Sequence, residues 1–118
     1  MSIFSISDAT TQTIGRALDG LDARQRAIAS NIANVETPGY QARSVNFEDG
    51  LREAMRRGDP MSATIDVTRS MAPTRLNGNN VNLDFELLES SEAVLQQRML
   101  TQTLTSKYSM LGTAIRGR

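Results

Sequence analysis

The stretch that decides the fold of this 118-residue chain covers residues 14–40 and reads IGRALDGLDARQRAIASNIANVETPGY. Apolar residues recur in it at alternating steps of four and three, and only Gln25 breaks the series. The apolar members of the series are Ile14, Leu18, Leu21, Ile28, Ile32 and Val35. A period of about 3.5 residues is typical of a coiled-coil seam. The sequence therefore predicts a long helix from about residue 9 to residue 35, capped by Ser7 or Asp8.

The predicted helix ends at Thr37-Pro38-Gly39, because proline disfavours a helical conformation at the residue before it and glycine permits a positive φ. This stop divides the chain into an N-terminal helical segment, residues 1–37, and a central region, residues 38–82. The helix face opposite the seam carries polar residues such as Arg16 and Arg24, and we expect solvent to cover it.

The first part of the central region contains the pattern of a short helix. Phe47, Leu51 and Met55 share one helical face, and Asn46 stands where a cap is expected. The turn-forming residues 58–60, Gly-Asp-Pro, end this run.

The second part of the central region predicts a small β-hairpin. Residues 63–68 alternate between apolar and polar, which is typical of a half-buried strand. Asn77-Gly78 is a strong turn pair, because both residues tolerate a positive φ. Val81 and Leu83 then supply the return strand.

The last segment, residues 83–118, contains a second long helix, which we expect from about residue 84 to residue 116. No proline or glycine interrupts it before Gly112. Acidic residues near its start and basic residues near its end complement the helix dipole. Its predicted seam consists of Leu87, Val94, Leu104, Tyr108, Leu111 and Ile115, and a neighbouring stripe consists of Leu88, Leu95 and Met99.

These elements predict a mainly α fold. The long N- and C-terminal helices pair as a coiled-coil-like hairpin, and a small irregular central region contains the short helix and the β-hairpin. Two helices bury only one side of each seam, so part of the apolar surface has no partner within the chain. We expect the seam of both helices, Gln25 included, to form an assembly interface with other chains.

The composition excludes several classes of function. The chain has no His, Cys or Trp, so it lacks an imidazole base, a thiolate nucleophile, the usual ligands of zinc, and disulfides. Its 13 basic and 13 acidic residues give no net charge, which argues against nucleic acid as a partner. The chain contains no apolar run of about 18 residues, so we expect no direct insertion into a membrane. Asp66, Asp84 and Glu86 lie in patterns of a strand and a helix cap, so we expect no catalytic, cofactor-binding or metal-binding residues and no small-molecule substrate.

Residues 30–40, SNIANVETPGY, resemble the N-terminal signature of bacterial flagellar rod and hook proteins, which has paired asparagines near the end of the first helix followed by Thr-Pro-Gly-Tyr. Residues 41–48, residues 78–84 (GNNVNLD) and the ending from residue 106 to residue 118 are similar to proximal-rod members. The residues that carry the family motif are Asn31, Asn34, Thr37, Pro38, Gly39, Tyr40, Gly78, Asn79, Asn80, Val81 and Asp84.

Each of these motifs also has a plainer interpretation. Asn31 and Asn34 are either polar residues at a frayed helix end, or groups that hydrogen-bond the following loop or a neighbouring subunit. The Thr-Pro-Gly-Tyr stretch is either a helix stop or a rigid corner anchored by Tyr40. Residues 77–80 form either a simple turn or a contact between subunits.

The resemblance implies a structural subunit, not an enzyme, in the proximal rod of the bacterial flagellar basal body. Such a subunit polymerises through its terminal helices, residues 1–37 and 83–118, which form the inner tube, and it links the membrane-ring and export-gate base to the rest of the rod. The implied partners are copies of itself, other flagellar rod proteins, and membrane-ring, rod-junction and export-gate proteins.

The resemblance also implies a location in the periplasmic rod, reached through the flagellar type III export apparatus without a cleaved signal peptide. Residues 1–8 contain no Lys or Arg and no long apolar stretch, which agrees with that route. Two alternatives remain at this point: a different proximal-rod paralogue, and a cytosolic helical secretion adaptor.

Overall fold

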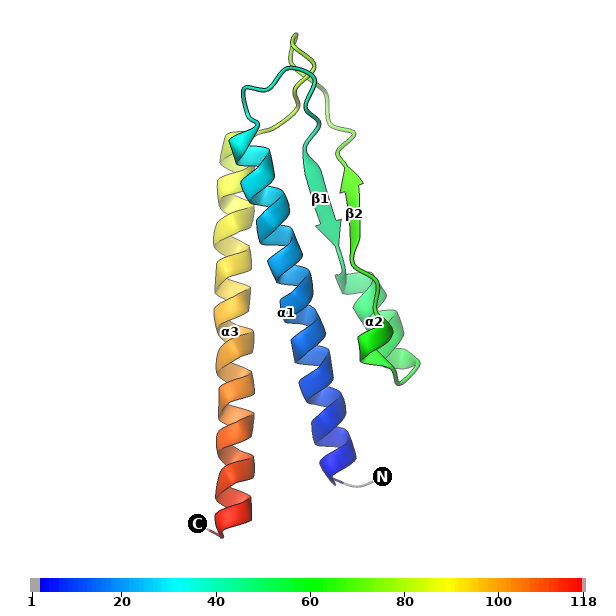
Figure 1. Ribbon diagram of the computed structural model, residues 1–118, viewed down its shortest axis with the longest axis vertical. Coiled ribbons are helices and arrows are strands. Elements are labelled where there is room, and N and C mark those ends of the chain that lie inside the picture. The colour runs from blue at the N-terminus through cyan, green and yellow to red at the C-terminus, as the bar shows by residue number, and fades with distance from the viewer. Residues whose placement is uncertain (1–2, 118) are drawn as a thin grey trace.

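The computed structural model describes the backbone of residues 3–117 and the side chains of residues 8–117. The molecule is flat and elongated, with extents of 64 × 28 × 14 Å (Figure 1). Its two long helices, α1 (Ile3–Ala33) and α3 (Leu83–Arg116), lie antiparallel and side by side, so α1 begins and α3 ends at the same end of the molecule. The predicted mainly α fold with paired terminal helices is confirmed.

The helix ends differ in how well the sequence predicts them. Because α1 already begins at Ile3, Ser7 and Asp8 lie inside the helix, and the predicted cap there is wrong. α3 is capped by Asn82, whose side-chain oxygen accepts a hydrogen bond of 3.1 Å from the backbone N–H of Phe85. It ends at Gly117, whose φ of 72° closes the helix in the left-handed conformation.

The central region contains β1 (Arg43–Asn46), α2 (Glu48–Arg56), a 3₁₀ turn η1 (Pro60–Ser62) and β2 (Asp66–Arg69). The two strands pair antiparallel, with Val45 opposite Val67. The expected short helix and two-stranded sheet are therefore confirmed. In α2 the buried residues are Leu51 and Ala54, and the predicted face residue Met55 is exposed.

The predicted return strand of the hairpin is wrong. β2 pairs with β1, which precedes α2, whereas Val81 lies in a loop and Leu83 is the first residue of α3. The turn at residues 77–78 is present, but its backbone bonds elsewhere: the N–H of Gly39 donates to the carbonyl of Asn77 at 2.8 Å. The chain after the turn therefore packs against the corner that follows α1 instead of folding back on β2.

α1 is the central layer of the molecule, with α3 on one side and the β1–β2–α2 unit on the other (Figure 1). The ring of Phe47 lies directly on the backbone of α1 at Gly20. A Cβ at Gly20 would lie 2.3 Å from the ring Cγ of Phe47, so only glycine permits this contact. The guanidinium of Arg24 covers the same ring, 4.8 Å from its centroid.

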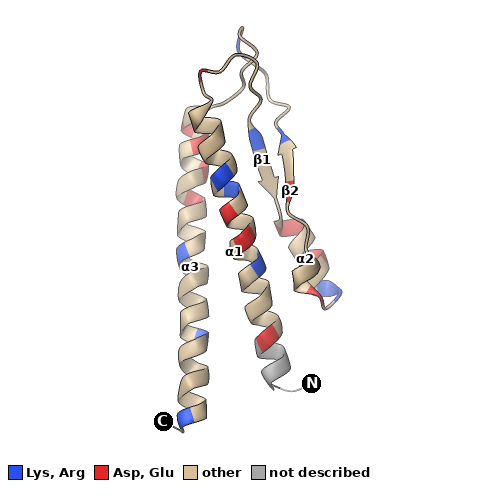
Figure 2. Cartoon of the chain, in the orientation of Figure 1, with Lys and Arg blue, Asp and Glu red and all other residues tan. Residues whose placement is uncertain are grey.

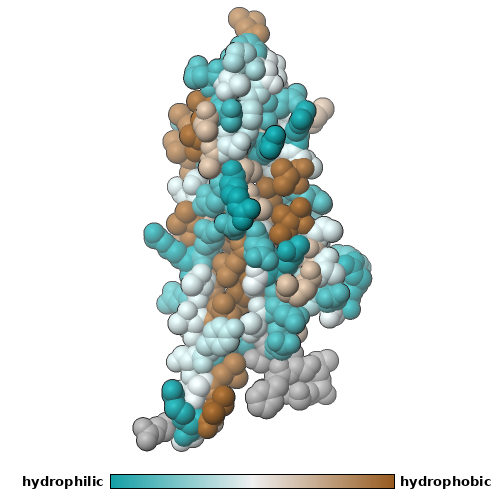
Figure 3. Space-filling model, viewed as in Figure 1, coloured by the Kyte–Doolittle hydropathy of each residue, from teal (hydrophilic) through white to brown (hydrophobic). Residues whose placement is uncertain are grey.

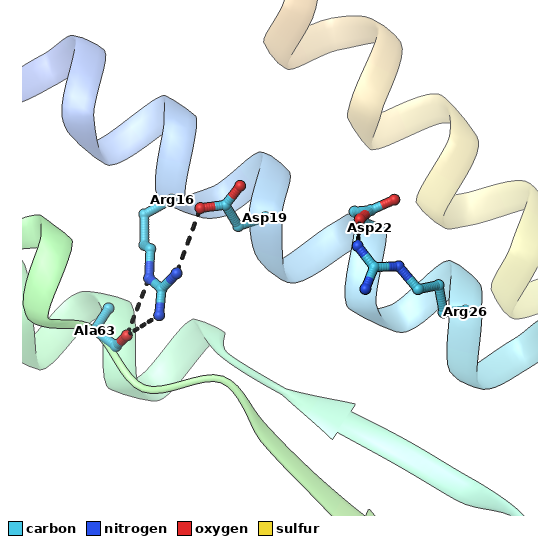
Figure 4. Close-up of polar contacts among 5 residues, drawn as sticks. All are labelled: Arg16, Asp19, Asp22, Arg26 and Ala63. Atoms are coloured by element: carbon cyan, nitrogen blue, oxygen red, sulfur yellow. Dashed lines mark hydrogen bonds and ion pairs between the residues drawn. The ribbon is translucent and has the colours of Figure 1, made fainter.

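Two arginines of α1 hold the central unit in place, although their position opposite the apolar seam predicts a solvated face. Arg16 donates from Nε and Nη2 to the carbonyl of Ala63, at 3.0 and 2.7 Å, and also pairs with Asp19 (Figure 4). Arg24 donates to the carbonyl of Val45 at 2.8 Å. Both guanidinium groups therefore satisfy backbone carbonyls on either side of α2 and η1, a role that apolar periodicity does not reveal.

Candidate assembly surface and motif cluster

The contact between the two long helices uses an unexpectedly polar row of α3. Residues at steps of four and three turn toward α1, and the buried ones among them are Glu86 and Ala93. Gln25 of α1 and Ser90 of α3 bond twice across this seam, at 3.2 and 3.3 Å. The whole row comprises Glu86, Ser90, Ala93, Gln97, Leu100, Leu104, Lys107 and Leu111.

The seam residues predicted for the first helix are all buried or half-buried, as their spacing predicts. Within α1, three of them are buried: Ile14, Leu21 and Ile28. Leu18, Gln25, Ile32 and Val35 are half-buried, and Val35 lies just beyond the end of the helix. Because α1 is covered on two sides, most of its apolar surface is used within the chain.

The predicted seam residues of α3 divide into two groups. Val94, Leu104 and Leu111 are half-buried beside α1, but Leu87, Tyr108 and Ile115 are 51, 57 and 80% exposed. Residues 87, 94, 101, 108 and 115 are spaced by seven, so they form one row next to the seam, which we call the outer row. The outer row is not part of the contact between α1 and α3, and its role in assembly stays a prediction.

A second apolar stripe lies on another face of α3. Leu88, Leu95 and Met99 are 56, 59 and 60% exposed. Figure 3 shows, for one face of the molecule, hydrophobic side chains gathered in a broken line along the long axis. A contiguous exposed apolar stripe is typical of an interaction site.

Asn31, a motif residue, is a fully buried junction at the end of α1. Its Nδ2 donates to the carbonyl of Arg43 at 2.9 Å and to Oε1 of Glu86 at 3.0 Å. Its Oδ1 accepts from the N–H of Arg43 at 2.9 Å and from the hydroxyl of Tyr40 at 3.0 Å. This one amide therefore joins α1, the corner, β1 and α3, with all four of its hydrogen-bonding positions occupied.

Asn34 and Tyr40 complete the end of α1. Asn34 donates to the carbonyl of Ser30 at 2.8 Å and accepts from the hydroxyl of Thr37 at 3.1 Å. The Tyr40 hydroxyl also lies 3.0 Å from the hydroxyl of Ser30. The paired asparagines are thus ordered and bond the following loop, so the interpretation as frayed polar residues is wrong. Pro38 is exposed beside this cluster.

Asn79 is a second fully buried junction, formed by the other half of the motif. Its Nδ2 donates to the carbonyls of Asn34 and Thr37 at 2.9 and 2.8 Å, and its Oδ1 accepts from the N–H of Val81 at 2.8 Å. Asn80 accepts from the N–H of Ala42 at 2.6 Å. The loop before α3 is therefore fastened to the corner after α1.

Two motif glycines allow this close approach. Gly39 and Gly78 have φ of 76 and 82°, and a Cβ at Gly78 would lie 3.3 Å from the Cα of Gly39. Asp84, the last motif residue, is exposed in the first turn of α3, where a carboxylate complements the helix dipole.

Two carboxyl groups near these junctions have shifted pKa values. Burial raises the pKa of Glu86, the hydrogen bond from Asn31 opposes that shift, and the neighbouring charge of Glu89 adds to it. The hydrogen bond from Arg24 lowers the pKa of Glu48.

Two kinds of feature are absent from the described residues. Within residues 3–117, no helix combines the length and apolar character needed to cross a membrane. In the same part of the chain, no group of three or more acidic, His or Cys side chains is placed to hold a metal ion.

Comparisons with known proteins place the chain in one family. A family model described as a flagella basal body rod protein matches residues 12–41, which include Asn31, Asn34 and the corner. The chain is 30% identical to the flagellar basal body rod protein FlgB of Bacillus subtilis (strain 168), over 99% of this chain and 98% of that protein. The chain belongs to the FlgB family of flagellar basal body rod proteins.

Other FlgB proteins give the same result. The chain is 30% identical to FlgB of Escherichia coli (strain K12), with 85% of this chain and 88% of that protein covered. It is 28% identical to FlgB of Salmonella typhimurium (strain LT2), with 93 and 95% covered. Membership of the FlgB family makes this chain a structural protein of the basal-body rod, and it favours that assignment over a secretion adaptor or a different rod paralogue.

Sequence reasoning missed several residues that organise the fold. Ser90 fits the predicted seam as a polar position, but Glu86 was overlooked as a seam residue because it is charged, although its spacing of four from Ser90 matches the seam. The roles of Arg16 and Gly20 have no signal in apolar periodicity, since each acts on a residue far away in the sequence.

Proposed function

We propose that this chain is a subunit of the proximal rod that polymerises through its terminal helices and joins the membrane-ring and export-gate base to the rest of the rod. The observation that carries the proposal is the outer row of α3. Leu87, Tyr108 and Ile115 are exposed on a helix whose other side is already packed on α1. In a monomer such a row stays exposed to solvent and adds no stability, whereas a tube of subunits buries it.

The layers of the fold give each segment of the chain a different place in the proposed tube. Residues 1–37 and 83–118 supply the inner tube, and residues 38–82 lie outside it. The asparagine cluster fixes the angle at which the chain leaves α1 and returns to α3, because Asn31 and Asn79 bond both sides of the excursion. The central unit is thus carried at a set position on each subunit.

The proposed partners are copies of this chain, other rod proteins, and membrane-ring, rod-junction and export-gate proteins. The proposed route is type III export without a cleaved signal peptide, into the periplasmic rod. Nucleic acid, small-molecule substrates and catalysis have no part in this function. Isolated helices are only marginally stable in water, and helices in proteins gain much of their stability from packing. The terminal helices therefore become fully ordered when the subunit docks.

The test is complementation of a strain that lacks its own copy of the gene. Ile115→Asp and Leu87→Asp place a charge in the outer row at exposed positions, so the monomer still folds. We expect both variants to be expressed and exported, but to give no rods and no swimming. Gln102→Asp, at an exposed polar position of the same helix, is the matched control and restores swimming. Normal swimming with both outer-row variants would rule out the proposed interface.

A further inference from the structure

Two arginines face each other across the small sheet. Arg43 begins β1 and Arg69 ends β2, and their Cα atoms are direct partners in the antiparallel ladder. They are the only basic residues of the two strands, and Figure 2 shows one blue position on each strand at that end of the sheet. Both side chains are exposed. Directly opposite residues project from the same face of a sheet, so the two positive charges lie side by side.

The backbone hydrogen bonds around this pair bring the two side chains close together. The N–H of Ser70 donates to the carbonyl of Ala42 at 2.7 Å, and both backbone groups of Arg43 bond to Asn31 instead of Arg69. The two arginines therefore form a non-hydrogen-bonded pair, in which the Cα atoms are about 4.5 Å apart. Like charges in directly opposite positions destabilise a sheet. The pair therefore lowers the stability of the free subunit unless a counter-charge lies between the two side chains.

The described part of the chain supplies no such counter-charge. Every arginine of α1 and α2 forms an ion pair with an acidic residue of its own helix or of a neighbouring one, but neither Arg43 nor Arg69 forms any. Arg43 also borders a second cleft that contains Glu86 and Glu89, yet neither carboxylate pairs with it. The counter-charge must therefore come from outside the chain, or solvent must serve instead.

The two arginines share an open cleft that can hold a small anionic group. Its volume is about 150 Å³. A cavity of about that size accommodates benzene, so the cleft has room for the carboxylate end of an acidic side chain. The residues that line it are Gly39, Tyr40, Gln41, Arg43 and Arg69.

The motif asparagines hold this cleft in one shape. Asn31 bonds both the N–H and the carbonyl of Arg43 at 2.9 Å. Asn80 donates to the carbonyl of Ser70, the residue after Arg69, at 3.2 Å. The backbone at both arginines is therefore fixed before a ligand binds, which lowers the entropic cost of binding.

We propose that Arg43 and Arg69 together bind the carboxylate of an acidic side chain on a neighbouring protein of the rod. This rests on the proposed function, because the acid belongs to a protein that assembles with this subunit. The fork of N–H donors on a guanidinium group matches the two oxygens of a carboxylate. One carboxylate between the two side chains cancels their repulsion, so the pair destabilises the free subunit and stabilises the assembled one.

An acidic protein side chain fits this site better than an anionic membrane does. Anionic lipid surfaces attract clusters of about four to eight basic residues, whereas this cleft contributes two. The chain as a whole has no net charge that would draw it to such a surface. A single carboxylate, with one charge and two oxygens, matches a pair of guanidinium groups.

The test is zero-length cross-linking in assembled basal bodies. The full chain with Arg43→Lys and Arg69→Lys keeps both charges and replaces the wild-type protein in a strain that lacks its own copy. A carbodiimide then joins a lysine amine to a carboxylate in direct contact, forming an amide while the reagent takes up the water. Lys107 is the only native lysine, so the wild-type chain gives the background. We expect the variant alone to form a product that joins this subunit to another chain, and peptide mass spectrometry identifies the acid.

The matched control carries its new lysines on α2. Arg52 and Arg56 pair with acids of the same helix at 3.2 and 2.8 Å. We therefore expect Arg52→Lys with Arg56→Lys to cross-link within one chain and to join no second chain. Should the double cleft variant fail to assemble, Arg43→Lys and Arg69→Lys are cross-linked as single variants.

A glutamine variant separates a binding role from a structural one. Arg43→Gln with Arg69→Gln removes both charges, and with them the repulsion across the sheet. We expect the urea midpoint of the purified variant to equal or exceed that of wild type, and its swimming halo in soft agar to shrink. A lower midpoint, or an unchanged halo, overturns the inference.

Three other outcomes are informative. A cross-link from residue 43 to Glu86 or Glu89 of the same chain, with none to another chain, shows an internal counter-charge and overturns the inference. Binding of the wild-type chain to phosphatidylglycerol vesicles, lost in the glutamine variant, assigns the cleft to a membrane surface and also overturns it. Failure of the wild-type gene to restore swimming removes the proposed function, whereas absence of the cross-link in a swimming strain removes this inference alone.

Discussion

Nδ2 of Asn31 and Oε1 of Glu86 are 3.0 Å apart, and both residues are buried. The last turns of α1 are thereby joined to the first turn of α3 by an amide and a carboxyl group at the point where the chain leaves one long helix and begins the other. The hairpin is fixed at this end by polar bonds and not by apolar packing alone. Buried polar groups that are all paired specify one arrangement, because leaving any of them unpaired is costly.

The Asn31 junction predicts a large effect of a small substitution. Asn31→Ala leaves the N–H and carbonyl of Arg43 and Oε1 of Glu86 without this partner, and it removes one of the two hydrogen-bond partners of the Tyr40 hydroxyl. We expect the free energy of unfolding to fall by about 1–3 kcal/mol. Urea denaturation followed by circular dichroism measures it. Asn46→Ala, at an exposed strand position, is the matched control and changes stability by less than about 0.5 kcal/mol. An equal effect of both substitutions would contradict the role of Asn31.

Glu86 predicts a pH dependence with a definite sign. Because burial raises the pKa of Glu86, the folded state binds the proton more tightly than the unfolded state. Stability from this group is therefore present at low pH and is lost as the pH rises through the folded pKa. Glu86→Gln keeps an acceptor oxygen for Asn31 and removes the buried charge. We expect this variant to be more stable than wild type at neutral pH, by a margin that shrinks on acidification.

The measurement for Glu86 is the difference in unfolding free energy between variant and wild type across acidic and neutral pH, in which other titrating groups cancel. Glu92→Gln, an exposed acid on the same helix, is the control and gives no such trend. A Glu86→Gln variant less stable than wild type at neutral pH would show that the charge itself stabilises the junction.

Two glycines of α1 predict opposite outcomes for the same substitution. At Gly20 the added methyl group would meet the ring of Phe47, so Gly20→Ala is expected to cost about 1–3 kcal/mol. At Gly15 nothing lies within 4 Å, so Gly15→Ala should stabilise the helix by about 0.5–1 kcal/mol. Thermal unfolding compares the two. In a Phe47→Leu background the cost at Gly20 should shrink, and an unchanged cost would rule out the ring contact.

The exposed end of α3 predicts uneven order in the free subunit. Met110 and Ile115 are 72 and 80% exposed, whereas Ala93, in the middle of the seam, is buried. We expect amide hydrogen exchange in dilute monomer to be at least about tenfold faster over residues 108–116 than over residues 86–97. Assembly should slow exchange in the first of these segments. Equally slow exchange throughout the free monomer would contradict the coupling of order to assembly.

The sequence predicts the long helices of this fold because their spacing is a local property. The series from Ile14 to Ile32 and the stop at Pro38 needed no knowledge of the rest of the chain. The register of α3 was harder, because the apolar residues Leu87 and Tyr108 lie beside the seam and the polar Glu86 and Ser90 lie in it. Period alone cannot show which of two neighbouring rows faces the partner helix.

The remaining features depend on long-range contacts. β2 looked like one half of a local hairpin, but its partner β1 lies on the other side of α2. The contact of Phe47 with Gly20 joins residues 27 positions apart, and no pattern within either segment records it. The resemblance of the motifs indicated the family, while the hydrogen bonds that explain Asn31 and Asn79 emerged only with the fold.

The pairing of Arg43 with Arg69 has a consequence for how this architecture can vary. Their Cα atoms are direct partners at the outer end of the ladder, so the whole β1–α2–β2 unit leaves and rejoins the rest of the chain at adjacent points. The segment between those two positions has to meet only one condition: its two ends must lie as close together as two neighbouring strands. A different domain of almost any size can therefore be inserted between these two positions. The two long helices then serve as a common scaffold for outer domains of different shapes.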